Sequence, residues 1–339
     1  MVVLYVGWTL LTLSHMSWGA ELTSDYHERS LVQGWREGAL ILGMLLVLIT
    51  PAVIDYLGPE DVQSARVAAM GWFVIILLPI TVLLAVTMVG ERDVPPPVHV
   101  PFREAMSVML NNMPLRRLLT ADLANGIGGA TLAALFIFVA SDVLSMGSWS
   151  SLILLIFFAT GVVFVPLMIR LSYRFGKHRT LAASAVFNGV TLPLTYTIAP
   201  GDVVLMSILM AMSGVNLGAG SFLLRAVMAD VADQDHLETG NQRTGLFFSV
   251  LTMTSKIGAA FAVGIVYVLI DYLGFAPGEE NTSLALEGVR GTFVLLPTAM
   301  YFAVAALMWN FPLDEKTQSE NRRLIIERSE REPLSLPLE

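Results

Sequence analysis

The chain alternates between long apolar runs and short polar segments. The chain contains nine apolar stretches, each about long enough to cross a hydrocarbon core of roughly 30 Å as a helix. They lie near residues 1–19, 38–57, 68–89, 118–144, 150–170, 180–199, 202–224, 244–272 and 291–311. Backbone groups in lipid need internal partners, and these continuous runs lack the alternation of barrel strands. The pattern therefore predicts an all-α membrane protein with nine transmembrane helices.

Composition supports this prediction and narrows the chemistry. Hydrophobic residues make up 55% of the chain and charged residues 14%, whereas soluble domains carry about 25% charged residues. The absence of cysteine excludes disulfides and thiol chemistry, and the five histidines form no metal-binding pair, so no metal and no cofactor are predicted. No basic stripe indicates nucleic-acid binding. The expected partners are the lipid bilayer and a small-molecule solute, with the chain acting as a monomer.

The basic residues predict an orientation. If the first span runs toward the cytoplasm, 17 of the 20 Lys and Arg residues lie on the cytoplasmic side, with Arg66 and Arg290 opposite and Lys256 inside a span. This is a strong positive-inside signal. We therefore expect an integral protein of the bacterial inner (plasma) membrane with a cytoplasmic C-terminus.

A proline-containing polar stretch divides the chain. It runs over residues 91–115 and includes Pro95, Pro96, Pro97 and Pro101, a composition typical of a linker between helical units. The predicted organisation is three spans in residues 1–90, a cytoplasmic linker at 91–115, six spans in 116–312, and a cytoplasmic tail at 313–339.

Lys256 lies about 13 residues into the eighth apolar stretch. An ammonium group at that depth costs at least a few kcal/mol unless it finds a partner or water. At about 1.5 Å per residue it lies nearly 20 Å from the start of the span, which is too deep for easy snorkelling to the interface. The position favours a functional role for this lysine.

Two further groups of polar residues are candidates. The loop after the seventh span carries Asp230 and Asp233, followed by Arg243. Such acidic clusters are often only solvated, but this one could also form a breakable ion-pair latch with arginines of the loop RLSYRFGKHRT. His15 near the end of the first span and Arg36 at the start of the second are ionisable groups close to the membrane, where they could face a cavity or anchor at the interface.

Three stretches resemble the glycoside-pentoside-hexuronide:cation symporter family of the major facilitator superfamily, which includes the melibiose permease. They are HMSWGAELTSDYHERSLVQGWRE at 15–37, RLSYRFGKHRTL at 170–181, and LLRAVMADVADQDHLETGNQRTGLFFSVLTMTSKIG at 223–258. The third is the most specific, and the similarity extends over essentially the whole chain. That family has twelve helices in two six-helix bundles, so the resemblance implies that these nine spans correspond to helices 4–12. Residues 1–90 would then be the remnant of the N-terminal bundle, and the chain either a fragment or a functional short form.

The resemblance also implies roles for particular residues. Lys256 matches a lysine beside the cation site, and Thr9 falls near a hydroxyl implicated in cation binding. Arg36 matches an arginine that contacts sugar, and His15 and Trp18 are expected to join it at the solute cavity. The expected gate consists of four residues: Asp230, Asp233, Arg243 and Arg174. Leu11 or Thr12 stands where the melibiose permease has a galactoside-binding aspartate, which argues against melibiose itself.

The predicted function is secondary active symport of a small organic solute, a sugar or glycoside among the candidates, driven by Na⁺ or H⁺ through alternating access. No nucleophile, base and orienting group occur together, so no enzyme activity is predicted. A non-transporting remnant or membrane scaffold is the alternative from another class, and a lipid-modifying membrane enzyme is a third. The enzyme would need clustered catalytic groups at one membrane face, whereas the dense polar cluster here resembles a transporter gate.

Overall fold

The computed structural model describes residues 2–23, 26–57, 62–90, 107, 110–241 and 243–331. Within these residues the chain is helical and contains no strand. The helices are α1 (Val2–Glu21), α2 (Tyr26–Leu57), α3 (Val62–Met88), α5 (Met113–Phe138), α6 (Ser150–Phe175), α7 (Lys177–Thr191), α8 (Val203–Thr239), α9 (Thr244–Tyr272), α10 (Ser283–Trp309) and α11 (Glu315–Arg331). Most of the linker predicted at 91–115, and the end of the tail from 332, lie outside the described residues.

Nine of these helices coincide with the nine predicted spans, which confirms the fold class. Among the described residues, six helical segments are long and apolar enough to cross a membrane, judged by length and composition alone. They are α3, α5 with the turn that follows it, α6 with the turn that precedes it, α8, α9 and α10. Helix α7 is shorter, and a 3-10 segment (Leu192–Thr197) with Pro193 near its start continues it. Proline lacks the backbone donor that an α-helix needs there, so the regular helix ends.

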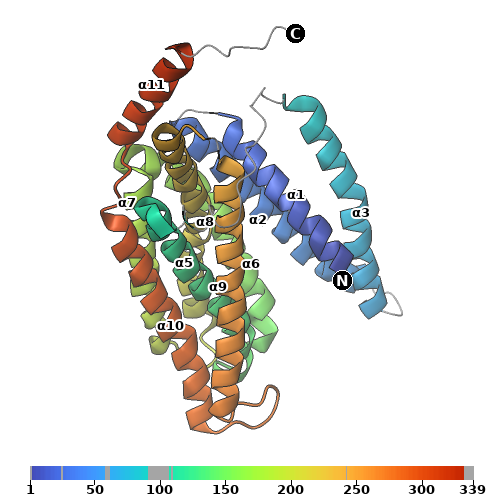
Figure 1. Cartoon of the computed structure of the whole chain (residues 1–339). Coiled ribbons are helices and arrows are strands. Elements are labelled where there is room, and N and C mark those ends of the chain that lie inside the picture. Colours follow the sequence, from blue (N-terminus) through green and yellow to red (C-terminus); the bar gives the residue numbers. More distant parts are fainter. Residues whose placement is uncertain are drawn as a thin grey trace.

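The helices form two groups (Figure 1). Helices α1, α2 and α3 lie together on one side, and α3 stands at the edge against α2. Helices α5 to α10 form the larger group, in which α5 packs against α9 and α10, and α8 against α6 and α7. Helix α2 crosses between the groups and packs against α6 and α8. The tail helix α11 lies at the end of the larger group opposite the α9–α10 loop.

Capping residues set several helix ends in the larger group. The Asn112 side chain accepts a hydrogen bond from the Leu115 backbone nitrogen at 2.8 Å, and Asp202 caps α8 in the same way. Such side chains satisfy backbone donors that have no partner inside the helix. Helix α8 ends at Gly240, whose φ of 75° is the left-handed conformation that glycine adopts most readily.

Helix α8 extends well beyond the membrane stretch predicted from hydropathy. The prediction ended this span at residue 224 and placed a loop after it, but the helix continues to Thr239. The added turns carry Asp230 and Asp235, which are 1% and 4% exposed. The helix continues because these turns pack against α7 and α11. Such packing stabilises a helix in a polar segment for which hydropathy alone predicts a loop.

Small residues bring helices of the larger group into close contact. A Cβ atom at Gly214 of α8 would lie 2.3 Å from the Phe157 carbonyl oxygen of α6, and one at Gly258 of α9 would lie 2.9 Å from the Leu123 carbonyl oxygen of α5. Both distances are too short for a real side chain. These crossings therefore depend on glycine, as membrane helix packing commonly does.

Candidate functional site

A cavity of about 540 Å³ lies between the two helix groups. Helices α1, α2 and α3 line one side of it, and α5, α8 and α9 line the other. Its ionisable lining residues are His15, Arg36, Asp122, Arg225 and Lys256. A volume of this size suits a small organic molecule. A cavity at the interface of two helix groups is also where membrane carriers bind their solutes.

Lys256 reaches from α9 to the other helix group. Its ammonium donates a hydrogen bond to the Thr9 hydroxyl of α1 at 3.1 Å and lies 4.6 Å from the ring centroid of Trp8. The sequence predicted Lys256 and Thr9 as neighbours of one cation site, and the structure brings these two side chains together. A cation over the face of an aromatic ring is attracted to it, so the Trp8 ring stabilises the Lys256 ammonium inside the apolar span.

The three residues predicted to contact solute are placed differently from one another. His15 and Arg36 both line the cavity. Trp18 is not among the cavity-lining residues, and its indole nitrogen is buried. The structure therefore keeps His15 and Arg36 together at the cavity and places Trp18 apart from it.

Four residues of the site were not singled out from the sequence. Asp122 of α5 is 5% exposed, and its carboxylate accepts a hydrogen bond at 2.7 Å from the Ser255 hydroxyl of α9. Arg225 of α8 donates to the Glu37 carboxylate of α2 at 2.5 Å, so this ion pair joins the two groups. Asp122 lies inside a predicted span, and an intramembrane carboxylate is the sequence signal that could have found it. Glu37 precedes its predicted span by one residue and gives no such signal.

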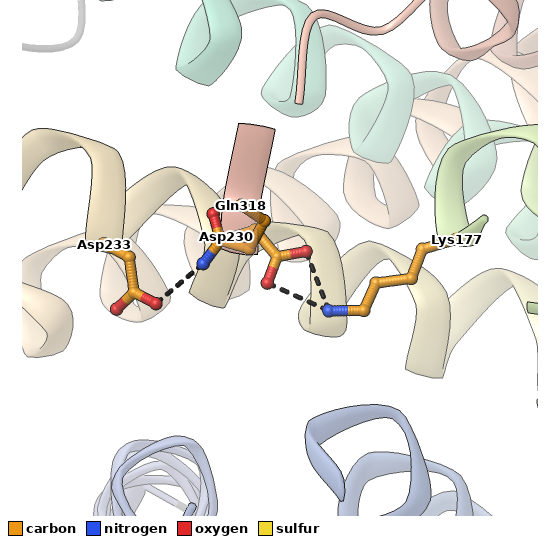
Figure 2. Close-up of polar contacts among 4 residues, drawn as sticks. All are labelled: Lys177, Asp230, Asp233 and Gln318. Carbon is orange, nitrogen blue, oxygen red and sulfur yellow. Dashed lines mark hydrogen bonds and ion pairs between the residues drawn. The ribbon is translucent and has the colours of Figure 1, made fainter. Parts of the chain in front are cut away.

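A buried ion pair joins α7 to α8 (Figure 2). The Lys177 ammonium lies 2.7 and 2.9 Å from the two carboxylate oxygens of Asp230, and the two side chains are 1% and 2% exposed. One turn further along α8, Asp233 accepts a hydrogen bond at 2.8 Å from the Gln318 amide of α11. These contacts attach both α7 and the tail helix to the end of α8.

The predicted gate residues are thus only partly gathered. The predicted partner Arg174 is exposed, and its guanidinium lies 5.4 Å from the centroid of the neighbouring Phe175 ring. Lys177 of the same segment pairs with Asp230 instead. Arg243 lies 3.9 Å from Asp235. The Lys177–Asp230 pair lies within the larger group, whereas the Arg225–Glu37 pair crosses between the groups.

The first turn of the tail helix is capped by an aspartate. The Asp314 carboxylate accepts hydrogen bonds from the backbone nitrogen of Thr317 at 2.9 Å and from its hydroxyl at 2.8 Å. The backbone hydrogen bond is the larger cause that holds the pKa of this carboxyl below its usual range. This cap starts α11 next to Gln318, which is 1% exposed.

The fold and the cavity define the class of the protein. Apolar helices surround a cavity between two groups, and a few charged side chains stand in its largely apolar wall. This arrangement is suited to holding a solute inside the membrane. Among the described residues no group of three or more His, Cys, Asp or Glu side chains could hold a metal ion. The site is that of an integral membrane transporter.

Comparison with known proteins gives the family. Residues 1–315 match the family described as MFS/sugar transport protein, so the chain belongs to this transporter family of the major facilitator superfamily. It is 21% identical to a glucuronide carrier protein homolog of Escherichia coli (strain K12), over 92% of this chain and 69% of that protein. It is 24% identical to a putative sulfoquinovose importer of Salmonella typhimurium, over 88% of this chain and 64% of the relative.

A third relative is an uncharacterized 29.9 kDa protein of Pseudescherichia vulneris, 30% identical over 44% of this chain and 56% of that protein. The chain thus spans roughly 56% to 69% of the length of these three relatives. Family membership agrees with the resemblance to cation symporters noted in the sequence. The family is one of transporters and not of enzymes.

Proposed function

We propose that this protein carries out cation-coupled symport of a small organic solute of the sugar or glycoside class, driven by Na⁺ or H⁺. The observation that carries the proposal is the cavity between the two helix groups, to which each group contributes charged side chains. Rocking of one group against the other would expose such a cavity to each side of the membrane in turn. The contact of Lys256 with Thr9 would break and re-form in that motion.

The charge of the cavity favours a solute with an acidic group. Three basic side chains line it, Arg36, Arg225 and Lys256, and the carboxylate of Asp122 is the one acidic group in the lining. In a medium of low dielectric constant this excess positive charge attracts an anion, and arginine binds carboxylates and sulfonates through paired hydrogen bonds. Two relatives, a glucuronide carrier protein homolog and a putative sulfoquinovose importer, are named for acidic sugars, which fits this preference.

Orientation and assembly are part of the proposal. We place the protein in the bacterial inner membrane as a monomer with its C-terminus in the cytoplasm, because the basic residues concentrate on that side. In this orientation the Lys177–Asp230 pair and α11 lie at the cytoplasmic end, where they would stabilise the state that is closed to the cytoplasm.

The test is uptake by the purified chain in proteoliposomes. The probes are radiolabelled methyl glucuronide and the neutral methyl glucoside, each with an inward Na⁺ gradient, an inward H⁺ gradient, or neither. We expect gradient-driven accumulation of the glucuronide above that of the glucoside. Lys256→Val should abolish this accumulation, and Lys316→Val, an equal change at an exposed tail position, should leave it intact.

Each part of the proposal can fail separately. Accumulation that ignores both gradients would refute cation coupling. Equal uptake of the two probes would refute the acidic-solute preference. No uptake of either probe, with the protein correctly inserted, would favour the non-transporting scaffold.

A further inference from the structure

We propose that Asp122 is a cation-binding carboxylate of this transporter, which takes up the H⁺ or Na⁺ that drives solute movement. The inference rests on the proposed symport and assigns its coupling step to a residue of α5. The carboxylate lies in the wall of the solute cavity and is 5% exposed. A buried carboxylate surrounded by apolar helices is costly unless a proton or a cation compensates its charge.

Two of the positive side chains of the cavity contact residues of the smaller helix group. Arg225 pairs with Glu37 of α2, and Lys256 donates to Thr9 of α1. Among the described residues, Asp122 forms no ion pair and receives its side-chain hydrogen bond from Ser255. Neither of these two basic groups therefore pairs with the Asp122 carboxylate. That leaves room for a small, exchangeable cation.

The surroundings of Asp122 contain oxygen ligands as well. The Ser255 hydroxyl touches the carboxylate, and Asn125, one helical turn further along α5, lines the same cavity. Carboxylate, hydroxyl and amide oxygens are the ligands that hard cations prefer. The same carboxylate can bind a proton, in which case its new O–H group would donate to the Ser255 oxygen. Both ions share the chemistry of neutralising Asp122.

Charged groups from every element around Asp122 enter this argument. Arg225 comes from α8 and Lys256 from α9, while Arg36 and His15 face the cavity from α2 and α1. Helix α10, which also packs against α5, carries the ionisable residues Glu287, Arg290 and Tyr301. Arg290 donates to the carbonyl oxygens of Thr195 and Ile198, and the cavity lining includes no residue of α10.

Close helix packing fixes the contact between Asp122 and Ser255. A Cβ atom at Gly126 of α5 would lie 3.2 Å from the Ser255 carbonyl oxygen, and one at Gly258 of α9 would lie 2.9 Å from the Leu123 carbonyl oxygen. The two backbones thus nearly touch on both sides of the contact. A change in charge at Asp122 is therefore felt by α9 and not absorbed by a loose interface.

Helix α9 carries that change to the other helix group. Ser255 contacts Asp122, and the next residue, Lys256, contacts Thr9 of α1. A cation that binds Asp122 acts on the carboxylate oxygens that Ser255 contacts, and a shift of Ser255 moves Lys256 as well because the two residues are adjacent on α9. The Lys256 contact across the cavity then changes its strength with the cation, and this links cation binding to the movement of the groups.

Asp122→Asn tests the assignment in proteoliposomes with methyl glucuronide as the probe. We expect loss of uphill uptake driven by a Na⁺ gradient at equal pH or by a pH gradient without Na⁺, whichever drives the parent protein. Counterflow, in which labelled solute exchanges for unlabelled solute without a cation gradient, should persist. Asp142→Asn is the matched control, because it makes the same change beyond the end of α5 and outside the cavity lining.

The outcomes separate this inference from the proposed function. Unchanged uphill uptake in Asp122→Asn overturns it, and so does loss of counterflow in a protein that elutes like the parent, since Asp122 would then serve solute binding. If Asp122→Asn does not fold, Asp122→Glu keeps the charge and should shift the half-saturating Na⁺ concentration or pH; no shift overturns the inference. A parent protein without gradient-driven uptake refutes symport itself.

Discussion

The ion pair between Arg225 and Glu37 should bias the transporter toward the arrangement of helices described above. It joins α8 of the larger group to α2 of the smaller one, so rocking of the groups would break it. Its nitrogen and oxygen lie 2.5 Å apart, and the side chains are 19% and 7% exposed. Glu37→Gln removes the negative charge and keeps the size of the side chain.

The structure sets the size of the effect. A hydrogen bond between charged groups contributes about 1.5–3 kcal/mol, and loss of one partner from a fully buried pair costs about 3–5 kcal/mol. Because Arg225 keeps partial access to solvent, we expect about 2 kcal/mol. If the pair forms in one arrangement alone, this value shifts the equilibrium between the two arrangements by roughly 30-fold.

The chain contains no cysteine, so one introduced thiol reports access without background. Ser221→Cys places it in the wall of the cavity with little change in size. Its rate of reaction with a membrane-impermeant maleimide is measured from each side of the membrane. Glu37→Gln should change the ratio of the two rates by an order of magnitude or more, toward the side that reacts slowly in the parent.

Two further variants make the result decisive. Glu320→Gln breaks the exposed Arg323–Glu320 pair, whose side chains are 66% and 62% exposed, and should leave the ratio unchanged because exposed pairs contribute little. The exchange Glu37→Arg with Arg225→Glu should restore much of the parent ratio. A ratio unmoved by Glu37→Gln would refute the inference that this pair opens and closes with the groups.

Other contacts predict stability effects, measured by thermal unfolding in detergent. Lys177→Ala removes the ammonium that pairs with the buried Asp230 carboxylate and should lower the free energy of unfolding by about 3–5 kcal/mol. The double variant Lys177→Met with Asp230→Leu should recover most of that loss. A double variant as unstable as the single one would contradict this reasoning. Gly214→Ala places a methyl group against the Phe157 carbonyl oxygen and should cost about 1–3 kcal/mol, while Gly264→Ala meets no atom within 4 Å and should cost nothing.

Hydropathy predicted the helices well because every span must be an apolar helix long enough to cross the hydrocarbon core. It could not predict how far α8 continues to Thr239, since that segment is held by Asp230 and Asp233 contacts with Lys177 and Gln318. Such contacts join residues far apart in sequence. No local pattern encodes them, and a charged segment beyond the membrane looks the same whether it is helix or loop.

The sequence singles out a candidate site residue most clearly where one charge stands alone in an apolar stretch. Lys256 met this criterion, but Asp122 lies only five residues into its predicted span and Glu37 one residue before its own. The sequence also could not decide which basic residue faces Asp230. Gly176, with a φ of 86°, ends α6 and starts α7 in a new direction, so Lys177 turns inward although Arg174, three residues earlier, is exposed.

The kinds of contact within and between the helix groups differ in a way that suits alternating access. Within the larger group, Gly214 and Gly258 bring backbones together so closely that the helices cannot shift independently. Between the groups, α2 packs against α6 and α8, and two contacts between polar side chains cross the cavity: Lys256 with Thr9, and Arg225 with Glu37. Side-chain contacts can break one at a time while the backbone packing holds. The larger group can therefore move as one body, and the ions and solute in the cavity act on the contacts that must yield first.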